Sequence, residues 1–231
     1  MASVVDVFRK VCLGRHSTKR FATGRSIPKE TLADVLKSTM AAPSGFNLQP
    51  WQIIMVQDSS IKEMLAEASM LGAGNQFRVN DASAIAVFCA DLQLRHRIER
   101  VVQLEVESNR KRRLRDDGYL ASLPLVANIL TGEGFVATGL KRAATDILSY
   151  SGISSMPDIE GVEAWSYKNV CFAAQNYMLS ATSHNLATCA MEGFDSRRVR
   201  DVLRIPDRYV IIDNMMNLKM SPNFAQYVYE K

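Results

Sequence analysis

Residues 42–56 read APSGFNLQPWQIIMV. Pro43 rigidifies this stretch, Gly45 permits close approach of the backbone, and Ser44 and Asn47 offer hydrogen-bonding groups within a short turn. From Trp51 onward the residues are rich in aromatic and β-branched side chains, which predicts a strand. A loop this dense in turn residues could hold a flat heterocycle, although an ordinary helix-to-strand connection uses the same residue types. The composition of the loop alone therefore leaves its role open.

Hydrophobic periodicity outside this loop predicts helices and strands that do not alternate strictly. Helices are expected from Pro28 to Met40 and over residues 60–70, 93–115, 164–185 and 196–203, and strands over residues 51–56, 84–90 and 209–212. The long helix over residues 164–185 is apolar or small around much of its circumference, which predicts burial, including at a subunit interface. This order favours an α+β fold over a doubly wound parallel sheet.

The stretch over residues 118–161 is interrupted by several glycines and a proline. Such interruptions predict short helices and mobile loops, which are typical of a lid. We therefore expect one domain over residues 1–231, with a helical lid excursion at about residues 93–161.

The bulk composition is that of a globular domain with a sizeable core, since 47% of the 231 residues are hydrophobic and 23% are charged. The formal net charge of +4 is compatible with an anionic ligand such as phosphate and too small to demand nucleic acid. Four widely spaced cysteines without a C-x-x-C pair are typical of reduced thiols in an intracellular protein. No lipid-facing span is apparent, so we expect a soluble, cytoplasmic protein, with an organellar address as the alternative.

A basic, hydroxyl-rich cluster occupies residues 15–19, RHSTK. It places the forked cation of Arg15 and the point charge of Lys19 beside the hydroxyl groups of Ser17 and Thr18. Phosphate recognition needs this mixture. A basic run by itself more often forms a solvated face, so the meaning of the cluster depends on the segments that accompany it.

Four segments in order resemble the nitroreductase family of FMN enzymes: residues 15–19, residues 42–51, residues 75–83 (NQFRVNDAS) and residues 186–195 (LATCAMEGFD). The third resembles the segment whose asparagine and basic residue contact the flavin, which implies Asn75 and Arg78. The fourth resembles the family turn whose backbone donors meet the N5 side of the flavin ring, which implies Glu192 and Gly193.

The resemblance implies an α+β fold with a central, mostly antiparallel sheet flanked by helices. It also implies a homodimer with FMN at its interface, in which the loop over residues 44–47 reaches the flavin from the partner subunit. The residues that it assigns to the cofactor are Arg15, His16, Ser17, Thr18, Lys19, Pro43, Ser44, Gly45, Asn47, Asn75, Arg78, Met191, Glu192 and Gly193.

The chemistry that the resemblance implies is a ping-pong reaction without a dedicated catalytic acid. NADH or NADPH delivers hydride to flavin N5, and a nitroaromatic, quinone or related conjugated acceptor then takes the electrons. The cofactor carries the redox step, while the protein supplies position and electrostatics. Tyr119 and Phe135, in the expected lid, are candidates for stacking on an aromatic acceptor.

One departure concerns the C-terminal segment. Family members commonly continue to a basic residue that helps to bind the flavin phosphate, whereas Asn223 stands at that place here. Lys219 is the candidate substitute, and the phosphate site is expected to be weaker than usual.

Other function classes were weighed against this assignment. Within flavin chemistry the alternatives are a reductive dehalogenase and a flavin-fragmenting enzyme, and outside enzymology a non-catalytic flavin-binding or nucleic-acid-binding module. The basic run over residues 95–115 contains interspersed acidic residues and no aromatic residue, which favours a solvated helix face over a nucleic-acid partner. No membrane partner is expected either. The three histidines lack metal-ligand spacing, so no metal is expected. A nucleophilic Cys189 with His184 as its base is the remaining, weaker alternative.

Overall fold

The computed structural model describes residues 2–21, 26–112, 124, 135–151 and 161–220. The chain divides into two units. The first consists of Met1–Ala42, Gln52–Cys89 and Val170–Lys231, and the second of Pro43–Trp51 and Ala90–Asn169. The expectation of one domain with an excursion over residues 93–161 stays a prediction, and the two units are described in turn.

Four strands form one sheet in the order β1-β2-β4-β3. They are β1 (Trp51–Val56), β2 (Ala84–Asp91), β3 (Leu186–Met191) and β4 (Tyr209–Met220). β3 and β4 are antiparallel, with Leu186 opposite Met220. The amide of Asp91, which ends β2, donates to the carbonyl of Pro50, just before β1, at 3.0 Å. This places the end of β2 beside the start of β1, as in antiparallel neighbours. The predicted α+β fold with an antiparallel sheet is confirmed.

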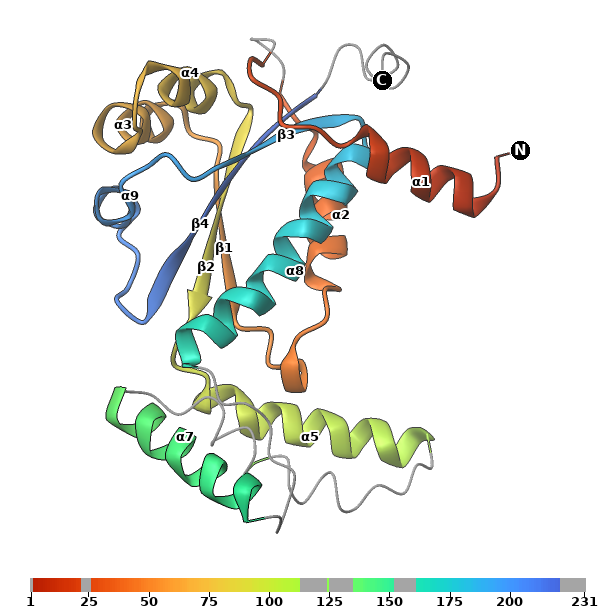
Figure 1. The fold of residues 1–231 in the computed structure, drawn as a ribbon. Coiled ribbons are helices and arrows are strands. Elements are labelled where there is room, and N and C mark those ends of the chain that lie inside the picture. The colour runs from red at the N-terminus through yellow and green to blue at the C-terminus, as the bar shows by residue number, and fades with distance from the viewer. Residues whose placement is uncertain (1, 22–25, 113–123, 125–134, 152–160, 221–231) are drawn as a thin grey trace. The chain divides into compact units, whose positions relative to one another are not determined.

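Both faces of β2 are buried in the first unit. Ile85, Val87 and Cys89 belong to an apolar cluster shared with α3 (Ser59–Ser69), α4 (Ala73–Asp81) and α9 (Ser196–Leu203). Phe88 points to the other face, where its ring meets Tyr177 of α8 (Val162–Ser183) edge-on, with centroids 5.4 Å apart. Successive side chains alternate between the faces of a strand. Helices therefore cover both faces of the sheet in this unit, with α3, α4 and α9 on one side and α2 (Lys29–Met40) with α8 on the other (Figure 1).

The second unit has its own small core. Leu48, Leu94, Ile98 and Trp165 are buried together, and the partly buried Phe46, Val101 and Val102 pack against them. The last two valines and Ile98 form an apolar stripe on α5 (Arg95–Arg112), a helix rich in charged residues. The unit also contains the short 3-10 helix over Gly45–Asn47 and α7 (Phe135–Tyr150).

Every helix and strand predicted from periodicity is present, but several boundaries and elements differ. The unpredicted α1 (Val4–Gly14) exposes its apolar residues, so no buried face marks it, and a capping box between Ser3 and Asp6 supports its first turn. Residues 73–81 form the helix α4, and β4 extends beyond the predicted residues 209–212 to Met220.

Two expectations are wrong, and a third is not tested. Residues 186–191, assigned to a turn, form the strand β3, which leaves only residues 192–195 for the turn. α7 is a single 16-residue helix within a stretch expected to hold short helices and loops, because one glycine, Gly139, costs a helix only about 1 kcal/mol. α8 exposes Cys171 and Phe172 (51%) in the single chain, so its burial at a subunit interface stays a prediction.

Candidate functional site

The cluster over residues 15–19 lies along the free edge of β3 in the first unit. The amide of Thr18 donates to the carbonyl of Thr188 at 2.9 Å, and Ser17 forms a parallel bridge with the same strand residue. The backbone is therefore fixed by β3, and the side chains are left available. Among the described residues, the side chains of Arg15, Ser17 and Lys19 make no hydrogen bond and no ion pair.

The other two side chains of this cluster bind each other. Nδ1 of His16 lies 3.1 Å from the carbonyl of Gly14, which identifies Nδ1 as the protonated nitrogen. Nε2 can then accept a hydrogen bond from the hydroxyl of Thr18, 3.3 Å away. His16 and Thr18 thus stiffen the segment, while Arg15, Ser17 and Lys19 offer donors suited to a phosphate.

The turn over residues 192–195 is tied to the connection between α3 and α4. The carbonyl of Gly193 accepts hydrogen bonds from the amide of Leu71 at 3.0 Å and from Nδ2 of Asn75 at 2.9 Å. The amide of Asp195 donates to the carbonyl of Ser69 at 2.8 Å. Glu192 is consequently held at the surface, with Met191 buried behind it.

Asn75 fixes both the turn at Gly193 and the side chain of Arg78. Both hydrogens of its Nδ2 go to protein carbonyls, those of Gly193 and Leu71, each at 2.9 Å. Its Oδ1 accepts a hydrogen bond from Nη1 of Arg78 at 2.5 Å. Nε of Arg78 is buried and has no hydrogen-bond partner among the described residues. The free donor at this position therefore belongs to Arg78, which Asn75 holds in place.

Two cations from distant parts of the sequence act on one thiol here. Burial raises the pKa of Cys189, while the positive charges of Arg78 and Lys19 act in the opposite direction. Lys19, a phosphate candidate, and Arg78, a flavin candidate, thus both act on Cys189 of β3. The same burial keeps Cys189 protonated, and Nε2 of His184 lies 3.0 Å from Oδ2 of Asp34 instead. Both observations argue against a cysteine nucleophile with a histidine base.

Replacing Gly193 with alanine is expected to destabilise the protein by about 0.5 to 1.5 kcal/mol, the net contribution of a typical hydrogen bond, because the groups that lose their partners are exposed or only partly buried. The added Cβ would lie 2.3 Å from Nδ2 of Asn75, so the amide group must leave the Gly193 and Leu71 carbonyls. Urea unfolding of the apo-protein measures the loss. Gly74→Ala on α4 is the matched control, because its Cβ meets nothing nearer than 3.9 Å. Equal stability of the two variants would contradict this role of Gly193.

The loop over residues 43–49 belongs to the second unit and is held from within it. Oδ1 of Asn169 accepts a hydrogen bond from the amide of Gly45 at 2.8 Å, and Oγ of Ser44 accepts one from the amide of Gln49 at 2.8 Å. A Cβ at Gly45 would lie 2.7 Å from the ring of Trp165, so glycine is required there. Pro43 and Asn47 are exposed. Sequence reasoning missed Asn169 and Trp165, because a polar and an aromatic residue on a mostly apolar helix carry no distinguishing signal.

The structure describes some of the remaining candidate residues and not others. Lys219 stands opposite Ala187 in the β3–β4 register, so its backbone is two strand spacings, about 10 Å, from residues 17–18. Phe135 begins α7, whereas Tyr119 and Asn223 lie outside the described residues. Within the described part of the chain, no group of three His, Cys, Asp or Glu residues could hold a metal ion. None of the described helices has the length and apolar character that crossing a membrane requires.

The geometry is that of an α+β protein with positive charge gathered at one edge of its sheet. The profile of the Nitroreductase family matches residues 13–216. This chain therefore belongs to the nitroreductase family.

Individual relatives agree with this assignment. MhqN of Bacillus subtilis, which is named as an NAD(P)H nitroreductase, is 27% identical over 199 residues, 86% of this chain and 81% of that protein. A Thermus thermophilus protein named NADH dehydrogenase is 26% identical over 205 residues, 88% of this chain and 82% of that protein. A crystal structure from Exiguobacterium sibiricum, in complex with FMN, has the same fold, with a TM-score of 0.69 and 18% identity over 94% of this chain and 89% of that one.

Proposed function

We propose that this protein is an FMN-dependent oxidoreductase that uses NADH or NADPH to reduce nitroaromatic, quinone or related conjugated acceptors. Membership of the nitroreductase family, the names of the two relatives and the FMN in the Exiguobacterium sibiricum structure support this assignment. The observation that carries it is the buried Nε of Arg78, which has no partner among the described residues, together with the unpaired side chains of Arg15 and Lys19 beside β3.

The donors present fit a flavin with a phosphate tail. Arg15, Ser17 and Lys19 would bind the phosphate, since forked and point cations with a hydroxyl group match its oxygens. Arg78, held by Asn75, would donate to the flavin itself, where its charge favours negative charge on the ring. The backbone at Glu192 and Gly193, fixed by the bonds to Leu71 and Asn75, would border the reactive edge of the ring.

FMN, when bound, supplies the redox chemistry by taking up hydride and passing electrons to the acceptor. The residues of the chain bind and orient, and none of them is assigned as a dedicated catalytic acid. His16, the histidine of the set, already contacts Gly14 and Thr18. The proposed reaction order is ping-pong: NAD(P)H leaves before the acceptor occupies the same space.

A second copy of the chain completes the proposed enzyme. The N-terminal helix α1 exposes Val4 (86%), Phe8 (63%) and Leu13 (76%), and Phe172 on α8 is 51% exposed. The exposed apolar residues of α1 are typical of a surface that a subunit covers. In the homodimer the loop over residues 44–47 of the partner subunit would reach the flavin.

An anaerobic reduction experiment tests this function. The purified protein, supplied with FMN if necessary, is expected to be yellow and to lose its flavin absorbance when NADH or NADPH is added without oxygen. Adding a quinone or a nitroaromatic compound should restore the colour within a few turnovers. A protein that takes up no FMN would overturn the proposal, and one that binds FMN without being bleached would be a flavin-binding module. Products released from a halogenated acceptor or from the flavin itself would identify the dehalogenase or flavin-fragmenting alternatives.

A further inference from the structure

The loop over residues 44–49 is held in an unfavourable backbone conformation. Phe46, Asn47 and Gln49 have φ angles of 53°, 55° and 47°, in the left-handed region that residues with a Cβ avoid. Such residues persist only where their surroundings fix them, and they concentrate at ligand-binding segments. What fixes this loop therefore bears on what it does.

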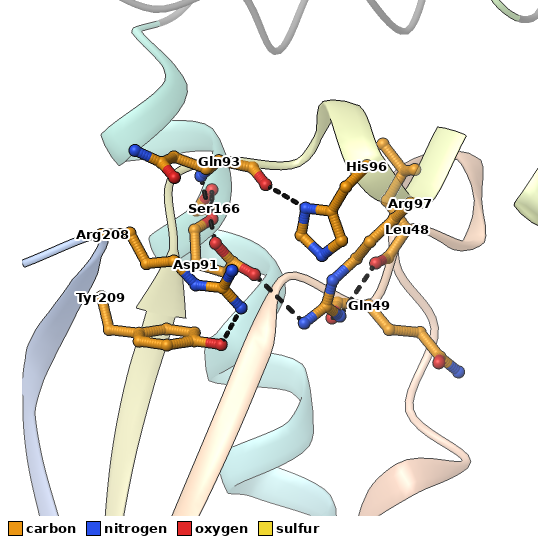
Figure 2. A network of polar contacts seen from close by, with 9 residues as sticks. All are labelled: Leu48, Gln49, Asp91, Gln93, His96, Arg97, Ser166, Arg208 and Tyr209. Carbon is orange, nitrogen blue, oxygen red and sulfur yellow. Dashed lines mark hydrogen bonds and ion pairs between the residues drawn. The ribbon is translucent and has the colours of Figure 1, made fainter. Parts of the chain in front are cut away.

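Arg97 on α5 grips the end of this loop. Its Nη1 donates to the carbonyl of Gln49 and lies 3.4 Å from the carbonyl of Leu48. Its Nη2 lies 3.2 Å from Oδ2 of Asp91, which is fully buried, whereas the side chain of Arg97 is 24% exposed. Figure 2 shows the guanidinium group between the Asp91 carboxylate and the loop carbonyls.

Asp91 is itself immobilised at the end of β2. Its Oδ1 accepts a hydrogen bond from the amide of Gln93 at 3.1 Å, and its carbonyl accepts one from Oγ of Ser166 at 3.2 Å (Figure 2). Its amide donates to the carbonyl of Pro50 at 3.0 Å. The Asp91 carboxylate thus fixes the orientation of Arg97. Asp91 is bonded to Pro50 and Arg97 to Gln49, so both partners of the ion pair contact the end of the loop.

The start of the loop is fixed by α8. Asn169 accepts from the amide of Gly45 at 2.8 Å and donates to the carbonyl of Trp165 at 2.7 Å, and the Trp165 ring lies directly against Gly45. Both ends of the segment are therefore anchored, and Asn47, between them, is exposed.

We propose that Arg97, oriented by Asp91, is a positioning residue that holds Phe46, Asn47 and Gln49 in their left-handed conformation before the flavin binds. The inference rests on the proposed function, in which this loop contacts FMN. Gln49 is only partly buried, so water could satisfy its carbonyl in place of Arg97. What a fixed guanidinium adds is a higher population of the conformation that binds, and the apparent affinity rises in proportion to that population.

The test compares Arg97→Met with Arg100→Met, an exposed arginine on the same helix. The dissociation constant of FMN, from quenching of flavin fluorescence by the apo-protein, is expected to rise about tenfold in Arg97→Met and to stay unchanged in Arg100→Met. The chain has two tryptophans, Trp51 and Trp165, and both adjoin the loop. Acrylamide quenching of their emission in the apo-protein should increase in Arg97→Met alone.

A rescue variant separates positioning from general support of the fold. Glycine adopts positive φ without strain, so Gln49→Gly in the Arg97→Met background should lower the FMN dissociation constant again, by roughly threefold. Wild-type affinity in Arg97→Met, or no recovery in the double variant, would overturn the inference. If the wild-type protein itself binds no FMN, the proposed function fails. A tryptophan quenching difference would still show whether Arg97 holds the loop.

Discussion

Replacing Arg78 with methionine is expected to weaken FMN binding by about 2 to 3 kcal/mol, within the range for a hydrogen bond to a charged group. Methionine keeps much of the apolar stem and removes every donor, including the buried Nε that has no partner among the described residues. The dissociation constant should be measured for FMN and for riboflavin, which lacks the phosphate. Because Arg78 is assigned to the flavin itself, both ligands should lose affinity to a similar extent.

The control for Arg78→Met is Arg197→Met, which removes an exposed arginine from α9. Arg78→Lys should fall between wild type and methionine, since lysine keeps the charge and loses the forked geometry. Unfolding of the apo-protein must be followed in parallel, because Asn75 loses the Arg78 partner of its Oδ1. Unchanged affinity for both ligands in a folded Arg78→Met protein would show that the flavin lies elsewhere.

Arg15→Ala is expected to lower FMN affinity by about 1.5 to 3 kcal/mol and to leave riboflavin affinity unchanged. The physical reason is that Arg15, half-buried and without a side-chain partner among the described residues, is assigned to the phosphate alone. The loss should shrink as ionic strength rises, because a charged contact is screened by salt.

Arg9→Ala on the preceding helix is the matched control, since this exposed residue pairs only with Asp6, 3.8 Å away, among the residues described. Equal losses for FMN and riboflavin in Arg15→Ala would contradict a phosphate anchor at this position. No loss for either ligand would move the anchor to another cation.

Local sequence patterns identified most of the elements. The apolar run of β2 and the stripe of Ile98, Val101 and Val102 on α5 predicted structure because burial enforces a periodic pattern. The exposed α1 and the glycine-containing α7 lacked such a pattern or carried a misleading one. The strand β3 was hidden for a different reason, since its residues are mostly small and its partner β4 lies far along the chain.

The candidate site, too, could be predicted from sequence only in part. Arg15, Lys19, Asn75 and Arg78 could be named from the order of their segments. Which of them donates to the flavin could not be predicted. The amide hydrogens of Asn75 are used by the carbonyls of Gly193 and Leu71, and Nε of Arg78 has no partner among the described residues, but these contacts form only in the folded protein.

The conformation and the contacts of the loop over residues 44–49 could not be predicted from sequence. Its turn residues signalled a special connection, but three left-handed residues cannot be read from Phe46, Asn47 and Gln49. Nor does the sequence reveal that Arg97, about 50 residues away, binds the loop carbonyls. The basic run that contains Arg97 was interpreted as a solvated face, and most of its described members are exposed.

A crystal structure of the protein grown with FMN tests the central claim most directly. We expect the phosphate to lie within hydrogen-bond distance of Arg15 and Lys19, and the flavin to contact Arg78 and the backbone at Gly193. We also expect the loop over residues 44–47 of a second subunit to touch the same flavin. FMN bound away from the β3 edge, or a saturated crystal without FMN there, would contradict the account.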